Sequence, residues 1–169
     1  MIGTDVFMLP RLNPERETAM SFSHTAGVKP APSGIELGRG ADGIVVEVLD
    51  HPELVIKDMN HPLKLGRNRV ALELRVLHAV LAATNELGAT RVFNHGTDEM
   101  ERSWLVRERV FDVEPRGTQA ERNTLLEVIF KIHPNADVNR LMLADPTFDN
   151  VRWGYTEANP EPRWILIDP

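Results

Sequence analysis

Apolar residues recur along this chain in two patterns, and each pattern predicts one kind of secondary structure. Short apolar runs bounded by turn residues are typical of β-strands. Such runs predict strands over residues 35–37, 44–49, 54–57, 91–96, 103–110, 151–153 and 163–167. Apolar residues at steps of three and four are typical of helices with one buried face, and they predict helices over residues 68–85 and 118–132.

The helix predicted over residues 68–85 is the clearest of these elements. Its apolar face consists of Val70, Leu74, Leu77, Val80 and Leu81. A glycine shortly after the last of these residues ends the pattern, as is common at helix C-termini. By contrast, residues 1–34 carry four prolines and scattered polar residues, which predict an extended or partly disordered lead segment with one short helix over residues 13–20.

Composition limits the classes of function. The 169 residues suffice for one domain or for two small lobes that share a cleft. A net charge of −6 gives no sequence-wide basic field, so we expect neither nucleic acid nor membrane as a partner. The absence of cysteine excludes disulfides, thiol catalysis and cysteine-type zinc sites. No secretory signal or membrane span is recognisable, so a cytoplasmic protein is the default expectation.

A glycine pattern lies between the first two predicted strands. Gly38, Gly40, Gly43 and Val45 form a G-x-G-x-x-G-x-V sequence, and an apolar run flanks it on each side. A dinucleotide-binding loop would instead be followed by a helix. Two flanking strands suit a hairpin that covers the phosphates of a nucleotide, so we interpret the four residues as a nucleotide-binding loop.

Lys57 ends the third predicted strand, fourteen residues after Gly43. A lysine at this distance from a glycine loop can reach the α- and β-phosphates, and it needs an acidic partner that fixes its position. Glu73 borders the apolar face of the following helix and is the predicted partner, with Glu86 as the alternative. Solvated charges are the competing interpretation for both Lys57 and Glu73.

Two further groups of polar residues follow late in the chain. Asp145 precedes Asn150 by five residues, the spacing of a phosphotransferase loop in which the aspartate orients the attacking hydroxyl and the asparagine binds magnesium. Asp168 ends the apolar run over residues 165–167 and can supply the second magnesium ligand. An ordinary turn rich in aspartate, proline and asparagine is the alternative for the first group.

The order of glycine loop, Lys57, Glu73, Asp145, Asn150 and Asp168 resembles the protein-kinase-like superfamily over residues 35–169. The resemblance implies an α+β, reduced bilobal kinase-like fold. Its N-lobe over residues 35–110 would contain a five-stranded antiparallel sheet and one helix, followed by a hinge and a strongly truncated C-lobe over residues 111–169. It also implies that residues 106–110 form the hinge, with Arg107 as gatekeeper and the backbone of Glu108 and Val110 bound to adenine.

The sequence departs from the kinase pattern at several positions. Leu143 and Ala144 stand in place of the usual His-Arg before the catalytic aspartate, and Pro169 stands in place of Phe-Gly. We therefore expect no control by phosphorylation of an activation loop. Thr147 stands where serine/threonine kinases carry a lysine, which leaves the class of acceptor open.

The small size and the loose lead segment resemble the minimal kinases that bacterial plant pathogens inject through type III secretion, the HopBF group. This resemblance implies an ATP- and Mg²⁺-dependent serine/threonine kinase that acts as a monomer in the host cytoplasm. Its implied substrate is a host protein, the ninety-kilodalton heat-shock chaperone. Two alternatives stay open: a small-molecule phosphotransferase of the aminoglycoside-kinase type, and a nucleotide-binding pseudokinase that acts as an interaction module.

Overall fold

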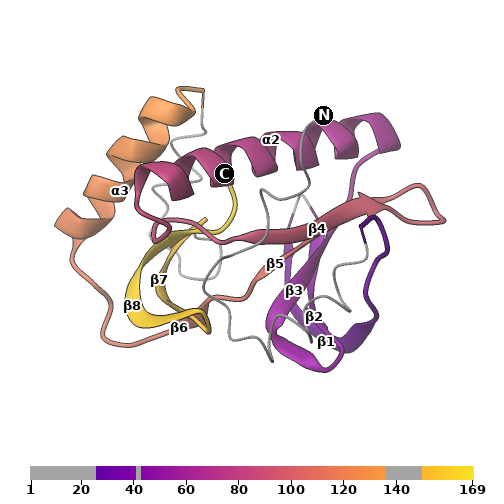
Figure 1. Ribbon diagram of the computed structural model, residues 1–169, viewed down its shortest axis with the longest axis horizontal. Helices are drawn as coiled ribbons and strands as arrows, with labels where there is room; N and C mark the ends of the chain where they lie inside the picture. Colours follow the sequence, from indigo (N-terminus) through magenta and orange to yellow (C-terminus); the bar gives the residue numbers. More distant parts are fainter. Residues whose placement is uncertain (1–25, 41–42, 136–149) are drawn as a thin grey trace. The chain divides into compact units, whose positions relative to one another are not determined.

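The computed structural model describes residues 26–40, 43–135 and 150–169 (Figure 1). These residues form an α+β fold with two antiparallel sheets and two helices, which confirms the predicted fold class at this level. The helix predicted over residues 13–20, Asp145 and Asp149 lie outside the described residues. The chain divides into two compact units: unit 1 contains Met1–Val70 and Arg91–Glu108, and unit 2 contains Ala71–Thr90 and Arg109–Pro169.

Unit 1 contains a five-stranded antiparallel sheet, as predicted, and its strand order is β1-β2-β3-β5-β4. Its strands are β1 (Pro32–Gly40), β2 (Gly43–Val48), β3 (His51–Met59), β4 (Val92–Thr97) and β5 (Ser103–Glu108). Its core is a cluster of six buried side chains, namely Val48, Leu54, Ile56, Phe93, Trp104 and Val106. Because side chains alternate along a strand, Leu54 and Ile56 face this core while Lys57 faces the opposite side of the sheet.

The segment before β1 is bound to the sheet, which the sequence did not predict. The Asn94 side chain accepts a hydrogen bond from the Gly27 N–H and donates one to the Val28 carbonyl, both at 3.2 Å. The Leu49 N–H donates to the Ala31 carbonyl at 2.8 Å. These contacts let β1 begin at Pro32, three residues before the predicted start at residue 35.

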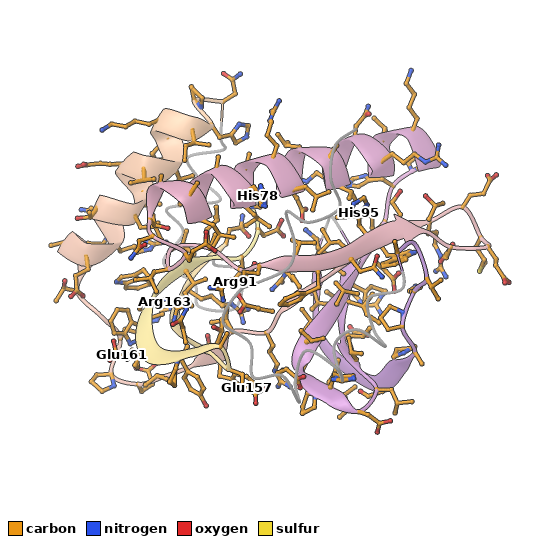
Figure 2. All side chains as sticks on the ribbon, in the orientation of Figure 1. His78, Arg91, His95, Glu157, Glu161 and Arg163 are labelled. Atoms are coloured by element: carbon orange, nitrogen blue, oxygen red, sulfur yellow. The ribbon has the colours of Figure 1, made fainter. Side chains whose placement is uncertain are left out.

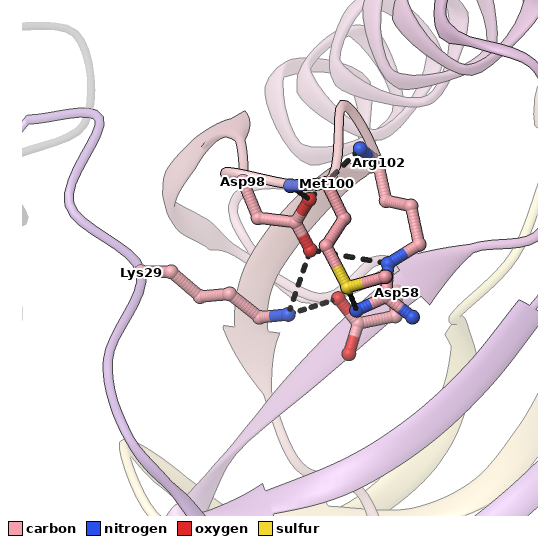
Figure 3. A network of polar contacts seen from close by, with 5 residues as sticks. All are labelled: Lys29, Asp58, Asp98, Met100 and Arg102. Atoms are coloured by element: carbon pink, nitrogen blue, oxygen red, sulfur yellow. Dashed lines mark hydrogen bonds and ion pairs between the residues drawn. The ribbon is translucent and has the colours of Figure 1, made fainter.

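Lys29 links this segment to two places in unit 1 (Figure 3). Its ammonium group lies 2.5 Å from the carboxylate of Asp58 on β3 and 3.7 Å from that of Asp98 in the β4–β5 turn. Asp98 also pairs with Arg102 at 3.2 Å and accepts hydrogen bonds from the N–H groups of Met100 and Arg102, each at 2.9 Å. Asp98 therefore fixes the β4–β5 turn, and together with Asp58 it holds Lys29 and the segment before β1.

Unit 2 contains a three-stranded sheet with the order β6-β7-β8, formed by β6 (Phe111–Asp112), β7 (Val151–Thr156) and β8 (Asn159–Leu166). Ala89 adds a parallel bridge to Leu166 at the other edge of β8. On one face, Trp153 and Trp164 pack edge to face with ring centroids 5.5 Å apart. The guanidinium of Arg122 on helix α3 stacks 5.6 Å from the Trp164 ring, which ties the helix to the sheet.

Helix α3 (Gln119–Ile132) begins where its sequence specifies. The Thr118 hydroxyl accepts a hydrogen bond from the Glu121 N–H, and the Glu121 carboxylate accepts one from the Thr118 N–H. This capping box satisfies two backbone donors that the first turn of a helix leaves open. At the other end, Pro134 cannot continue the helical hydrogen bonds, and the His133 N–H makes the last of them to Ile129.

Several predicted boundaries were wrong. Helix α2 (Leu63–Ala83) begins five residues before the predicted start at residue 68. Strand β5 ends at Glu108 instead of residue 110, and β6 was not predicted because its two residues give no periodic pattern. Neither helix of the described part is both long and apolar enough to cross a membrane.

Asp98→Asn should lower the free energy of unfolding by about 1 kcal/mol near neutral pH, because it removes the charge that Lys29 and Arg102 share. Partial burial alone would raise the pKa of Asp98, but the hydrogen bonds from Arg102 and Met100 and the charges of Arg102 and Lys29 outweigh it and lower this pKa. The contribution of the carboxylate is therefore fully present above the ordinary carboxyl pKa and is lost as the pH falls through the lower folded value.

Chemical denaturation at neutral and acidic pH measures this effect. The difference between wild type and Asp98→Asn should shrink below about pH 4. Glu99→Gln changes an exposed neighbouring carboxylate of the same turn and should have little effect at either pH. Equal destabilisation by both variants would contradict the assignment to Lys29 and Arg102.

Candidate functional site

The predicted nucleotide-binding loop is the hairpin that joins β1 to β2. Gly40 pairs with Gly43 next to the turn, and Gly38 pairs with Val45 two residues further along the two strands. Three of the four predicted loop residues are thus glycines close to the tip of an antiparallel hairpin, where Gly38 and Gly40 are exposed and Gly43 is buried. Exposed glycine backbone can approach a phosphate closely.

The fold requires only one of these glycines. Gly43 has a φ of +152°, and a Cβ atom there would lie 1.9 Å from the carbonyl oxygen of Asp58. Gly38 and Gly40 have neither a positive φ nor any atom within 4 Å of the position that a Cβ would occupy. Gly43 is therefore explained by the close approach of β3, whereas the open space at Gly38 and Gly40 is available to a ligand.

Lys57 lies in the middle of the sheet. Its strand neighbours in register are Val45 on β2 and Leu105 on β5. Val55 lies two residues before Lys57 on β3 and pairs with Arg107 on β5. We call the side of the sheet that carries these residues (Val45, Val55, Lys57, Leu105 and Arg107) the lysine face. The register thus brings the predicted lysine next to the last residue of the glycine pattern.

The burial of Lys57 limits its role. Only 3% of this residue is exposed, and lysine is almost never buried to this extent without an anionic partner. Glu73 on α2 is fully buried at 0% exposure, whereas Glu86 is exposed and follows the end of the helix. Burial therefore favours Glu73 over Glu86 as the acidic partner. Lys57 belongs to unit 1 and Glu73 to unit 2, and their pairing stays a prediction.

The predicted hinge residues lie where the chain leaves unit 1. The Glu108 N–H donates to the Arg91 carbonyl at 3.0 Å, and the Glu108 carbonyl accepts from the Arg107 guanidinium at 3.2 Å. The Glu108 carboxylate is 6% exposed and pairs with Arg91 at 3.1 Å. Val110 belongs to unit 2, where it packs in a small core with Ile165 and Ile167.

Asn150 and Asp168 lie together at one end of the β7–β8 pair. Val151 pairs with Leu166, so Asn150 and the residues after β8 follow at the same end. The backbone N–H groups of Ile167 and Asp168 donate to the Asn150 carbonyl at 2.8 and 3.4 Å. Both predicted metal ligands are partly exposed, which leaves their side chains accessible to a ligand.

The chemistry of this pair fits Mg²⁺. An amide oxygen and a carboxylate are hard oxygen donors, and Mg²⁺ is usually held by one or two protein ligands together with substrate phosphates. No group of three or more histidine, aspartate or glutamate side chains in the described residues could hold a metal by itself. Magnesium binding by Asn150 and Asp168 stays a prediction.

The sequence analysis did not identify Arg91, a polar residue that contacts the predicted hinge. Arg91 (labelled in Figure 2) precedes β4 and binds Glu108 through its backbone and its guanidinium. The two residues are seventeen positions apart, and only the antiparallel pairing of β4 and β5 brings them together. The only available signal was that Arg91 begins one predicted strand and Glu108 lies near the end of another. Charged residues at such positions are too common to indicate a specific pair.

Gly43→Ala should destabilise unit 1 strongly, because the new methyl group would overlap the Asp58 carbonyl and the backbone is strained for an L-residue. Gly38→Ala and Gly40→Ala meet no atoms and should leave the midpoint of thermal unfolding nearly unchanged or slightly higher. Thermal unfolding of the three variants compares them directly. A similar loss of stability in all three would contradict the distinction drawn between the glycines.

Comparison with protein-family models and with curated proteins found no relative of this chain. The resemblance to the protein-kinase-like superfamily therefore rests on the order of the site residues along the sequence.

Proposed function

We propose that this chain is a protein kinase that transfers the γ-phosphoryl group of ATP to a serine or threonine hydroxyl with the help of Mg²⁺. The observation that carries the proposal is the position of Lys57. It lies buried on the third strand of the sheet, in register with Val45 at the end of the glycine hairpin. A glycine-rich hairpin followed by a lysine on the third strand is the arrangement with which protein kinases bind the phosphates of ATP.

The space at the glycine hairpin supports the proposal independently. The fold itself has no need of glycine at positions 38 and 40, where a methyl group would meet nothing. Glycine at such positions is accounted for if another molecule approaches the backbone there. Phosphate oxygens that accept hydrogen bonds from backbone N–H groups would use this space.

The metal ligands provide a third line of support, from unit 2. Two backbone hydrogen bonds hold Asn150 beside the residues that follow β8. Kinases bind their metal ions through an asparagine of the catalytic loop and an aspartate that follows later in the chain. A Mg²⁺ ion held by Asn150 and Asp168 would neutralise charge on the β- and γ-phosphates.

Each proposed residue then has a defined role. Lys57 binds the α- and β-phosphates, and Glu73 fixes the lysine. Asp145 accepts the proton of the acceptor hydroxyl and orients the oxygen for in-line attack. Glu108 and Val110 bind the adenine through their backbone. The reaction requires no covalent intermediate, so catalysis depends on positioning and on electrostatic stabilisation of the transferred group.

The acceptor is proposed to be a host protein. This part follows from the resemblance to the type III secreted kinases, which names the ninety-kilodalton heat-shock chaperone as the first candidate. Incubation of the purified chain with labelled ATP, Mg²⁺ and a eukaryotic lysate would identify the labelled protein. In a parallel incubation with an aminoglycoside in place of the lysate, labelling of the aminoglycoside, together with no labelled protein in the lysate, would support the small-molecule phosphotransferase.

Lys57→Met should weaken the binding of Mg²⁺-ATP about tenfold or more, since it removes a charge-assisted contact to phosphate. Lys64→Met changes an exposed lysine on α2 and should leave the affinity unchanged. Removal of Mg²⁺, or Asp168→Ala, should also weaken binding. Isothermal calorimetry measures all of these affinities, and wild-type affinity in Lys57→Met would contradict the proposed phosphate site.

Asp145→Ala should lower turnover by a factor on the order of one hundred or more while ATP binding is retained, because the aspartate acts on the acceptor hydroxyl. Asp149→Ala is the matched control, one residue before Asn150, and should have a mild effect. Single-turnover phosphorylation of the identified substrate separates the two variants. ATP binding without any transfer by the wild-type protein would favour the interaction module over the kinase.

A further inference from the structure

The chain crosses between its two compact units at three peptide bonds. One crossing lies within helix α2, between Val70 and Ala71, and the other two follow Thr90 and Glu108. The residues on the unit 1 side of the latter two crossings are Arg91 and Glu108. These two residues are bound to each other.

Three hydrogen bonds join Arg91 and Glu108. One carboxylate oxygen of Glu108 accepts from the backbone N–H of Arg91 at 2.9 Å, and the other accepts from the Arg91 guanidinium at 3.1 Å. The Glu108 N–H donates to the Arg91 carbonyl at 3.0 Å. Arg91 therefore binds both the side chain and the main chain of Glu108.

The environment of this pair makes it stronger than an ordinary surface ion pair. The side chains of Arg91 and Glu108 are 11% and 6% exposed. At the opposite end of the same two strands, Arg102 pairs with Asp98, but there the arginine is 51% exposed. Water screens the Asp98–Arg102 pair much more than the buried one, so the two ends of the β4–β5 hairpin differ in how firmly they are held.

We infer that Arg91 is a positioning residue that fixes the backbone of Glu108 for nucleotide binding, an inference that rests on the proposed function. The N–H of Glu108 is committed to Arg91, so a ligand would meet this residue through its carbonyl. The same carbonyl accepts a hydrogen bond from the Arg107 guanidinium at 3.2 Å. A backbone acceptor contributes to affinity only if its position is fixed before the ligand arrives.

The test uses the double variant Arg91→Met/Glu108→Gln. A single change would leave one buried charge without its counterpart and could unfold unit 1, whereas the double variant removes both charges. Glutamine has the shape of glutamate, and methionine keeps an unbranched chain in place of the aliphatic part of arginine. Arg102→Met/Asp98→Asn removes the pair at the other end of the same hairpin and is the matched control. Arg91→Lys keeps the cation and the backbone bonds.

Two measurements are made on each variant. Hydrogen exchange of the peptide over residues 106–112, without nucleotide, reports how firmly the Glu108 N–H is held. Calorimetry with Mg²⁺-ATP reports the affinity. In Arg91→Met/Glu108→Gln, exchange at Glu108 should become at least tenfold faster and ATP affinity should fall about tenfold. The control and Arg91→Lys should stay within about twofold of wild type in both measurements.

The outcomes are distinguishable. Unchanged exchange at Glu108 would overturn the inference, whatever the affinity. Faster exchange with unchanged ATP affinity would overturn the positioning role and leave a purely structural pair. If the wild-type protein does not bind Mg²⁺-ATP at all, the proposed function fails, and the nucleotide role of Arg91 fails with it. The exchange data still decide whether Arg91 holds the Glu108 backbone.

Discussion

The antiparallel register of β2, β3 and β5 is the constraint on which the rest of unit 1 depends. The pleat of β3 directs Ile56 into the apolar core and Lys57 to the opposite face of the sheet. A shift of one residue would place the lysine in the apolar core and the isoleucine on the lysine face, so the hydrophobic pattern and the position of the charge specify the same register. This register also sets Val45 beside Lys57 and Arg107 beside Val55.

Much of this arrangement could be predicted from the sequence, because it depends on local signals. Short apolar runs between turn residues predicted the five strands of unit 1, and apolar residues at steps of three and four predicted the helix over residues 118–132. Other features depend on contacts between distant residues. The early start of β1 follows from the side chain of Asn94, and the burial of Glu108 follows from Arg91. Single-sequence patterns carry no information on such pairs.

The proposed machinery divides between the two units in a way that the sequence order alone does not show. Unit 1 carries the glycine hairpin, Lys57 and Glu108, and unit 2 carries Glu73, Val110, Asn150 and Asp168. Helix α2 belongs to both, since its first turns lie in unit 1 and the turn with Glu73 lies in unit 2.

The contacts of the segment before β1 have a mechanical consequence. A pulling force on the residues before Ala26 would reach the sheet first through Asn94 on β4 and Lys29, which is bound to Asp58 next to Lys57. These contacts would have to rupture before the load reached β1, an edge strand with a single neighbour. Traction on this segment would therefore load the contacts of Asn94 and Lys29 before it loads the hydrogen bonds between β1 and β2.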